Sequence, residues 1–116
     1  MEQAREQDKE IRWMGSSYRD LLAFPEEPRL QAGFQLGNIQ AGLEPDDWKP
    51  FDIIGPGTRE IRIREADGIY RVMYVTKFVE ALYVLHCFQK KTQKLGTYDR
   101  TIAETRYRAT IIDRKP

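Results

Sequence analysis

The basic side chains of the C-terminal half have the types and the spacing that could do chemistry. Arg62, Arg64 and Arg71 lie in two segments of alternating apolar and polar residues, and Lys90 and Lys91 end a third. An arginine guanidinium binds phosphate oxygens through paired hydrogen bonds and keeps its charge at any working pH, whereas lysine supplies a point charge. These residue types therefore favour a partner that carries phosphodiesters.

Charge is distributed unevenly along the chain. The 116 residues carry a net charge of +1. Residues 1–58 hold six Lys or Arg against eleven Asp or Glu, and residues 59–116 hold thirteen against seven, so the halves carry −5 and +6. A basic half is a weak indication of a polyanionic partner, and the alternative is a solvent-exposed surface of uneven charge.

Three segments around the arginines predict a small sheet. Ile61 and Ile63 alternate with charged residues over 59–64, and further strands are expected over 69–77 and 81–89. The short links between these strands predict an antiparallel meander. Because side chains alternate between the two faces of a strand, the arginines should lie opposite the apolar residues.

This alternation predicts a concave basic surface on one face of the sheet. The residues expected on it are Arg62, Arg64, Arg71, Lys90 and Lys91. The alternative is an ordinary charged face in solvent, with ion pairs such as that of Glu60 with Arg71.

The N-terminal half predicts helices that cover the other face. A short strand is expected over 10–14, Ser16 and Ser17 offer an N-cap, and prolines end the first helix near Phe24. The second helix has its expected apolar stripe at Leu30, Phe34, Gly37 and Ala41.

The remaining segments complete the predicted fold. Residues 42–58 hold three Pro and three Gly and are expected to form a loop, and 98–112 should be a final helix. The stripe of that helix is expected at Ile102, Arg106 and Ala109. The sequence thus predicts one α+β domain over 1–116, with an antiparallel sheet, helices on one of its faces and a flexible lead-in at 1–9.

His86 is the one histidine in the sequence, and it lies in an apolar strand. An imidazole with an ordinary pKa near 6.5 suits general acid–base catalysis. The alternative is a packed, hydrogen-bonded core residue, which is the commoner outcome for a histidine in such a strand.

Cys87 is the one cysteine in the sequence, so the chain forms no internal disulfide, and the polar N-terminus has no secretory pattern. No segment is apolar enough to cross a membrane. These features predict a cytoplasmic protein. No metal-ligand spacing and no phosphate-binding glycine loop is present, and we expect neither a metal nor a cofactor.

Two segments resemble a known family. They are Tyr70-Arg-Val-Met-Tyr74 and His86-Cys-Phe-Gln-Lys-Lys-Thr-Gln-Lys94, and they follow the two-helix pattern at the expected distance. Ile11-Arg-Trp-Met-Gly-Ser-Ser17 and Phe24-Pro-Glu-Glu27 add to the similarity, which covers most of residues 10–110. Together they resemble the phage-derived, HigB-like branch of the RelE superfamily of toxins from bacterial type II toxin–antitoxin systems.

The resemblance implies a RelE-like microbial RNase fold and a metal-independent endoribonuclease activity. Toxins of this kind cleave mRNA, usually on the ribosome, and so inhibit translation. It also implies a cognate antitoxin as partner, expected to be a small helix-turn-helix protein, and no membrane partner.

By position, the resemblance implies roles for several residues. Arg62 would contact the RNA backbone, Arg71 would stabilise the scissile phosphate, and Lys90 would act as acid or phosphate clamp, an assignment that can shift to Lys91. Proton transfer falls to Lys90 or His86. The further RNA-binding residues would be Arg64, Lys91, Lys94 and Tyr98.

Glu60 stands where many relatives carry a basic residue, which leaves the general base open. Two other functions therefore remain. One is a non-catalytic module that binds nucleic acid, and the other is a decayed toxin that binds an antitoxin in a regulatory complex.

Overall fold

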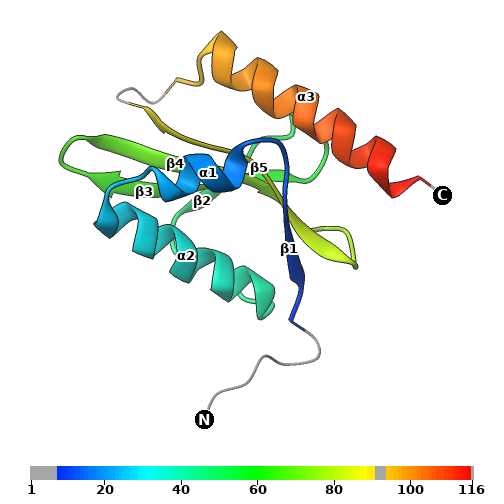
Figure 1. Cartoon of the computed structure of the whole chain (residues 1–116), viewed down its shortest axis with the longest axis horizontal. Helices are drawn as coiled ribbons and strands as arrows, with labels where there is room; N and C mark the ends of the chain where they lie inside the picture. Colours follow the sequence, from blue (N-terminus) through cyan, green and yellow to red (C-terminus); the bar gives the residue numbers. More distant parts are fainter. Residues whose placement is uncertain (1–7, 91–93, 116) are drawn as a thin grey trace.

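In this computed structural model, residues 8–90 and 94–115 are described, and they form five strands and three helices (Figure 1). The strands are β1 (Glu10–Trp13), β2 (Trp48–Pro50), β3 (Thr58–Glu65), β4 (Gly68–Val75) and β5 (Ala81–Lys90). The helices are α1 (Ser17–Leu22), α2 (Glu26–Gln40) and α3 (Thr97–Arg114). The predicted α+β class is confirmed.

The strands form one mixed sheet in the order β1-β5-β4-β3-β2. β3, β4 and β5 are the predicted antiparallel meander. β1, however, pairs parallel with β5, which is possible because two helices and three strands separate them along the chain. β2 adds an antiparallel edge strand beside β3. The predictions of a purely antiparallel sheet and of a loop throughout 42–58 were therefore wrong.

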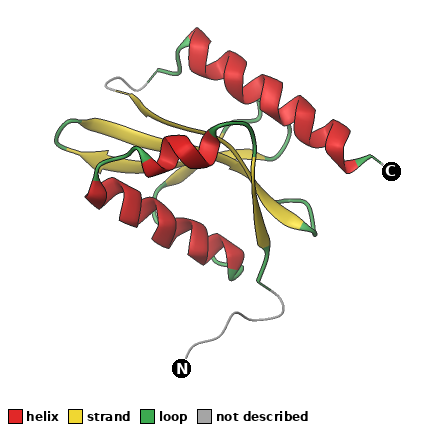
Figure 2. Cartoon of the chain, in the orientation of Figure 1, coloured by secondary structure: helices red, strands yellow, loops and turns green. Residues whose placement is uncertain are grey.

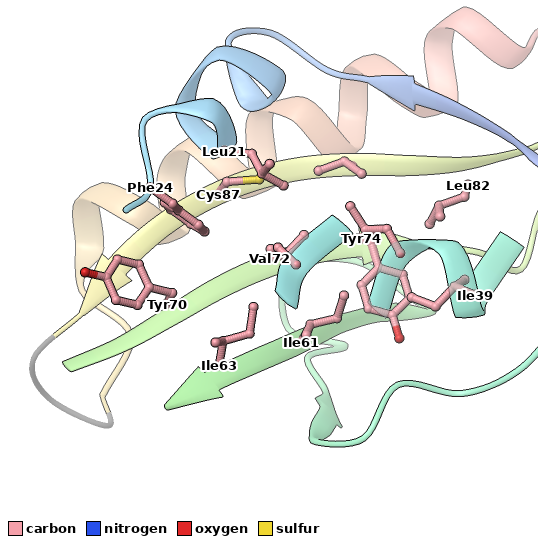
Figure 3. Close-up of a cluster of buried hydrophobic side chains, with 13 residues drawn as sticks. Leu21, Phe24, Ile39, Ile61, Ile63, Tyr70, Val72, Tyr74, Leu82 and Cys87 are labelled. Atoms are coloured by element: carbon pink, nitrogen blue, oxygen red, sulfur yellow. The ribbon is translucent and has the colours of Figure 1, made fainter. Parts of the chain in front are cut away.

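α1 and α2 cover one face of the sheet, called the hairpin face below (Figure 3). The buried side chains of this face are Ile61, Ile63, Tyr70, Val72, Tyr74, Leu82, Val84 and Cys87. The helices contribute Leu21, Phe24, Ala32, Leu36 and Ile39. Each large aliphatic side chain buried here contributes about 1.5–3 kcal/mol to stability. This core fixes which face of β3 and β4 remains for the arginines.

The predicted apolar stripe of α2 was wrong. Leu30 and Phe34 are 57% and 61% exposed, whereas Ala32, Leu36 and Ile39 face the sheet. Both sets recur at the spacing of one helical face, so periodicity alone could not choose between them. The sheet selects the set of smaller and branched side chains that fits against it.

α3 packs on the opposite face, called the α3 face below, so helices lie on both sides of the sheet (Figure 2). Its apolar cluster is made by Ile54, Met73, Val75, Leu85, Phe88, Ala103 and Tyr107. The prediction of helices on one face was wrong. The buried stripe of α3 is not the one predicted at Ile102, Arg106 and Ala109, but lies at Asp99, Ala103, Tyr107 and Thr110.

A β-bulge in β5 decides which of its side chains reach the α3 face. Tyr74 pairs with Val84 and Met73 pairs with His86, which leaves Leu85 as an extra residue between two ladder pairs. In an unbroken register His86 would oppose Val72 and point to the hairpin face. The extra residue instead turns His86, Phe88 and Lys90 toward α3.

Lys9, the residue before β1, is fixed to the loop after β4. Residues 1–7 of the predicted flexible lead-in lie outside the described residues. Lys9 donates hydrogen bonds to the carbonyl oxygens of Thr76 and Phe78. Among residues 8–90 and 94–115, no helix is long and apolar enough to cross a membrane.

Candidate active site

An acidic residue and two arginines form the centre of the α3 face. Arg62 on β3 and Arg71 on β4 are direct cross-strand partners, a position in which two like charges repel. Glu60 lies between them and accepts hydrogen bonds from Arg62 Nε at 3.1 Å and from Arg71 Nη1 at 3.4 Å. The carboxylate therefore reduces the repulsion between the two guanidinium groups.

This group is almost entirely buried, which corrects the predicted concave surface. Glu60 and Arg71 are both 0% exposed, and the side chain of Arg62 is 11% exposed. The ion pair of Glu60 with Arg71 is present as the sequence suggested, but in the interior rather than on a solvated face. Arg71 is buried on the α3 face, the face that the sequence left open.

Asp99, in the first turn of α3, joins the histidine to the lysine at the end of β5. Its Oδ1 lies 2.8 Å from His86 Nε2, and its Oδ2 lies 3.1 Å from Lys90 Nζ. The histidine is buried and stacks on Phe88 with ring centroids 4.6 Å apart. The sequence left open that His86 is a packed, hydrogen-bonded core residue. The structure shows this packing, and the hydrogen-bond partner is a carboxylate.

The partner of His86 determines its tautomer. A carboxylate only accepts hydrogen bonds, so Nε2 of the imidazole carries the proton that it donates to Asp99. Burial lowers the pKa of His86 below its ordinary value, although the hydrogen bond to Asp99 opposes this shift. Nδ1 is buried and has no hydrogen-bond partner among the described residues. The neutral ring therefore keeps a lone pair at Nδ1, the form that a general base requires.

The end of the sheet beside the start of α3 carries exposed basic and aromatic side chains. Arg64 and Lys90 flank Ile69 in adjacent strands, and Tyr98, next to Asp99, is 76% exposed. Lys94 is also exposed. Arg64 binds Asp47 at 2.9 Å, and its side chain is half exposed. Lys91 lies outside the described residues.

Gly96, the residue before α3, allows Lys90 to approach Asp99. A side-chain Cβ at Gly96 would lie 2.7 Å from Lys90 Nζ. Any other residue would therefore require the lysine ammonium to shift.

The structure brings together Arg62, Arg71, His86 and Lys90 on one face, and it adds two residues that sequence reasoning did not assign a role. Glu60 was noted only as a departure and as an ion-pair partner, and Asp99 was not singled out. An acidic residue two positions from Arg62 was the available signal for Glu60. Asp99 had none, because its partners are thirteen and nine positions away.

The fold and this site define a small α+β protein with a buried acid–base and guanidinium cluster under a C-terminal helix. A family model described as phage-derived protein Gp49-like (DUF891) matches residues 19–108. The chain therefore belongs to the phage-derived Gp49-like family, which is associated with the toxins of toxin–antitoxin systems. No curated protein and no solved structure matches the chain significantly.

Proposed function

We propose that the chain is the cytoplasmic toxin of a type II toxin–antitoxin system, an endoribonuclease of the RelE/HigB kind that cleaves mRNA on the ribosome and so inhibits translation. The observation that carries the proposal is the contact of one carboxylate, Asp99, with both His86 and Lys90, beside Arg62 and Arg71. This arrangement supplies a base, an acid and cations, the groups that cleavage by a 2′-hydroxyl requires without a metal.

In this mechanism His86 is the general base. Its Nδ1 takes the proton of the 2′-hydroxyl, the 2′-oxygen bonds to the adjacent phosphorus, and the bond from phosphorus to the 5′-oxygen breaks. Lys90 gives a proton to that leaving oxygen. The products are a 2′,3′-cyclic phosphate and a 5′-hydroxyl. Glu60 is the weaker candidate for the base because both its oxygens already accept hydrogen bonds from Arg71.

Arg62 is the guanidinium best placed to bind the phosphate. Its Nη2 is buried and has no hydrogen-bond acceptor among the described residues, and 11% of its side chain is exposed, whereas that of Arg71 is 0% exposed. Arg71 is fully buried, so we assign it the task of holding Glu60 and stabilising charge from beneath the site rather than by direct contact with the phosphate. The exposed Arg64, Lys94 and Tyr98 would bind the flanking RNA, Tyr98 by stacking on a base.

The test is purified protein with ribosomes and mRNA in EDTA, with cleavage sites and end groups mapped. We expect new 5′-hydroxyl ends in codon-positioned sites, and growth arrest when the chain is expressed in bacteria. His86→Gln should lower the cleavage rate about 100- to 10,000-fold, the usual worth of a general base. Arg100→Gln is the matched control, because Arg100 is an exposed arginine of α3 that pairs only with Glu104 among the described residues.

Intact mRNA from folded protein, with or without ribosomes, would refute the endoribonuclease. Cleavage that persists in His86→Gln but disappears in a Glu60→Gln protein shown to be folded at the assay temperature would move the base to Glu60. Cleavage that requires a divalent metal would refute the metal-independent mechanism.

One observation favours a second function, a non-catalytic toxin-like protein that binds an antitoxin or nucleic acid. Glu60 and Arg71 are 0% exposed, as in a structural ion pair. This function predicts RNA binding that weakens steeply with salt while the RNA stays intact, or a stable complex with a small helix-turn-helix protein without growth arrest.

A further inference from the structure

The register change in β5 affects the hydrogen bonding of the backbone carbonyl groups around it. The extra residue at Leu85 displaces β5 against β4, and buried carbonyl groups near such a bulge need partners from elsewhere. Val84, Leu85 and His86 are all buried. The partners of these carbonyls therefore decide whether the bulge is stable at this position.

The carbonyls of Val84 and Leu85 accept hydrogen bonds from segments far away in the sequence. The Val84 carbonyl accepts a hydrogen bond of 2.9 Å from the Met14 backbone N–H and one of 3.2 Å from Ser17 Oγ. The Leu85 carbonyl accepts a hydrogen bond of 3.0 Å from Arg106 Nη1 on α3. The bulge is thus held from the β1 side and from the α3 side.

Arg106 is itself fixed between three elements. Its Nη2 donates to Ser16 Oγ at 3.0 Å, and Ser16 Oγ donates to Asp20 at 2.7 Å. Gly15 has φ of +55°, and a Cβ there would lie 2.5 Å from Arg106 Nε. The guanidinium therefore lies directly against the backbone of the turn between β1 and α1, where a residue with a side chain would displace it.

We infer that Arg106 is a positioning residue that fixes the bulge at Leu85 and thereby turns His86 and Lys90 toward Asp99. The planar guanidinium can bind two acceptors at once in a fixed geometry, which a lysine ammonium on a flexible stem does less well. The same helix supplies Arg106 and Asp99, so α3 both sets the register of β5 and receives the side chains that this register presents. The role in catalysis rests on the proposed function, whereas the role in the register does not.

The test uses the one histidine of the chain, because its nitrogen signals in NMR report on position 86 alone. In the unaltered protein we expect a neutral ring with a slowly exchanging Nε2 proton and nuclear Overhauser contacts to Phe88. Arg106→Met keeps the length of the side chain and removes the donors. We expect it to lose the slowly exchanging proton and the ring contacts while the hairpin-face core stays folded.

Arg108→Met is the matched control on the same helix, because Arg108 is exposed and makes only a 3.5 Å contact with Thr105 among the described residues. It should keep the spectrum of the unaltered protein. Arg106→Lys keeps the charge, which separates loss of register from loss of the field of a nearby cation. It should change the histidine signals in the same direction by a smaller amount.

A folded Arg106→Met with unchanged histidine signals overturns the inference, as does an Arg108→Met that changes them equally. If Arg106→Met does not fold, Arg106→Lys decides, and an unchanged spectrum there overturns the inference. In a cleavage assay Arg106→Met should lower the rate on the order of 100-fold with RNA binding retained. If the chain proves not to cleave RNA, the NMR result still stands by itself.

Discussion

The buried carboxylate between two arginines offers the sharpest test of the energetics of this structure. Glu60→Gln keeps the size of the side chain and removes its charge, which breaks the ion pair of Glu60 with the fully buried Arg71. Breaking a buried ion pair by removing one member costs about 3–5 kcal/mol, since the other charge stays desolvated. A domain of this size has a free energy of unfolding of about 5–15 kcal/mol, so the loss is a large fraction of the whole.

The assay is urea unfolding followed by circular dichroism, with the melting temperature as a second measure. At about 4 °C per kcal/mol for a domain of this length, Glu60→Gln should melt roughly 12–20 °C lower. Glu65→Gln is the matched control, because Glu65 ends the same strand and is exposed. Its effect should stay within about 0.5 kcal/mol.

A double variant separates the charge from the packing. The double variant Glu60→Leu with Arg71→Met removes both charges of the pair and fills their space with apolar side chains. It should therefore be more stable than either single variant. Arg62 has an exposed fraction and can turn to water when its carboxylate is removed. A Glu60→Gln variant that loses less than about 1 kcal/mol would refute the reasoning that the cluster is a desolvated ion pair.

Three further measurements test other parts of the structure. Burial lowers the pKa of His86 in the folded chain, so as the pH falls below about 6.5 the histidine of the unfolded chain binds a proton before that of the folded chain. The free energy of unfolding should therefore decrease relative to that of His86→Gln, and an opposite slope would contradict this. Burial raises the pKa of the Cys87 thiol, so iodoacetamide should label it only when the chain is unfolded, and labelling of folded protein at the same rate would be contrary to the structure. Leu36→Ala should cost about 2–5 kcal/mol in urea unfolding and Phe34→Gln less than about 0.5 kcal/mol, because only the former is buried; equal losses would reverse the assignment of the two faces of α2.

Local patterns in the sequence predicted most of the helices and strands. Ile61 and Ile63 alternate with charged residues, and that alternation alone assigns Glu60, Arg62 and Arg64 to one face of β3, as the structure has it. Pro25 marks the break between α1 and α2, as predicted, although spacing did not give the buried stripes of α2 and α3. Such features depend on neighbours within a few positions, so they are readable along the chain.

Only the tertiary structure decided which faces are covered and which side chains meet. Nothing near Arg71 indicates that it is buried, and nothing near Leu85 indicates an extra residue in the register. The carbonyl of Leu85 is held by Arg106, twenty-one positions away, and His86 reaches Asp99 because of the bulge. A period-two pattern predicts which side chains of one strand share a face of the sheet, whereas a bulge reverses the faces of the residues that follow it. The bulge is held by hydrogen bonds from distant segments, so its position depends on the packing of the whole chain.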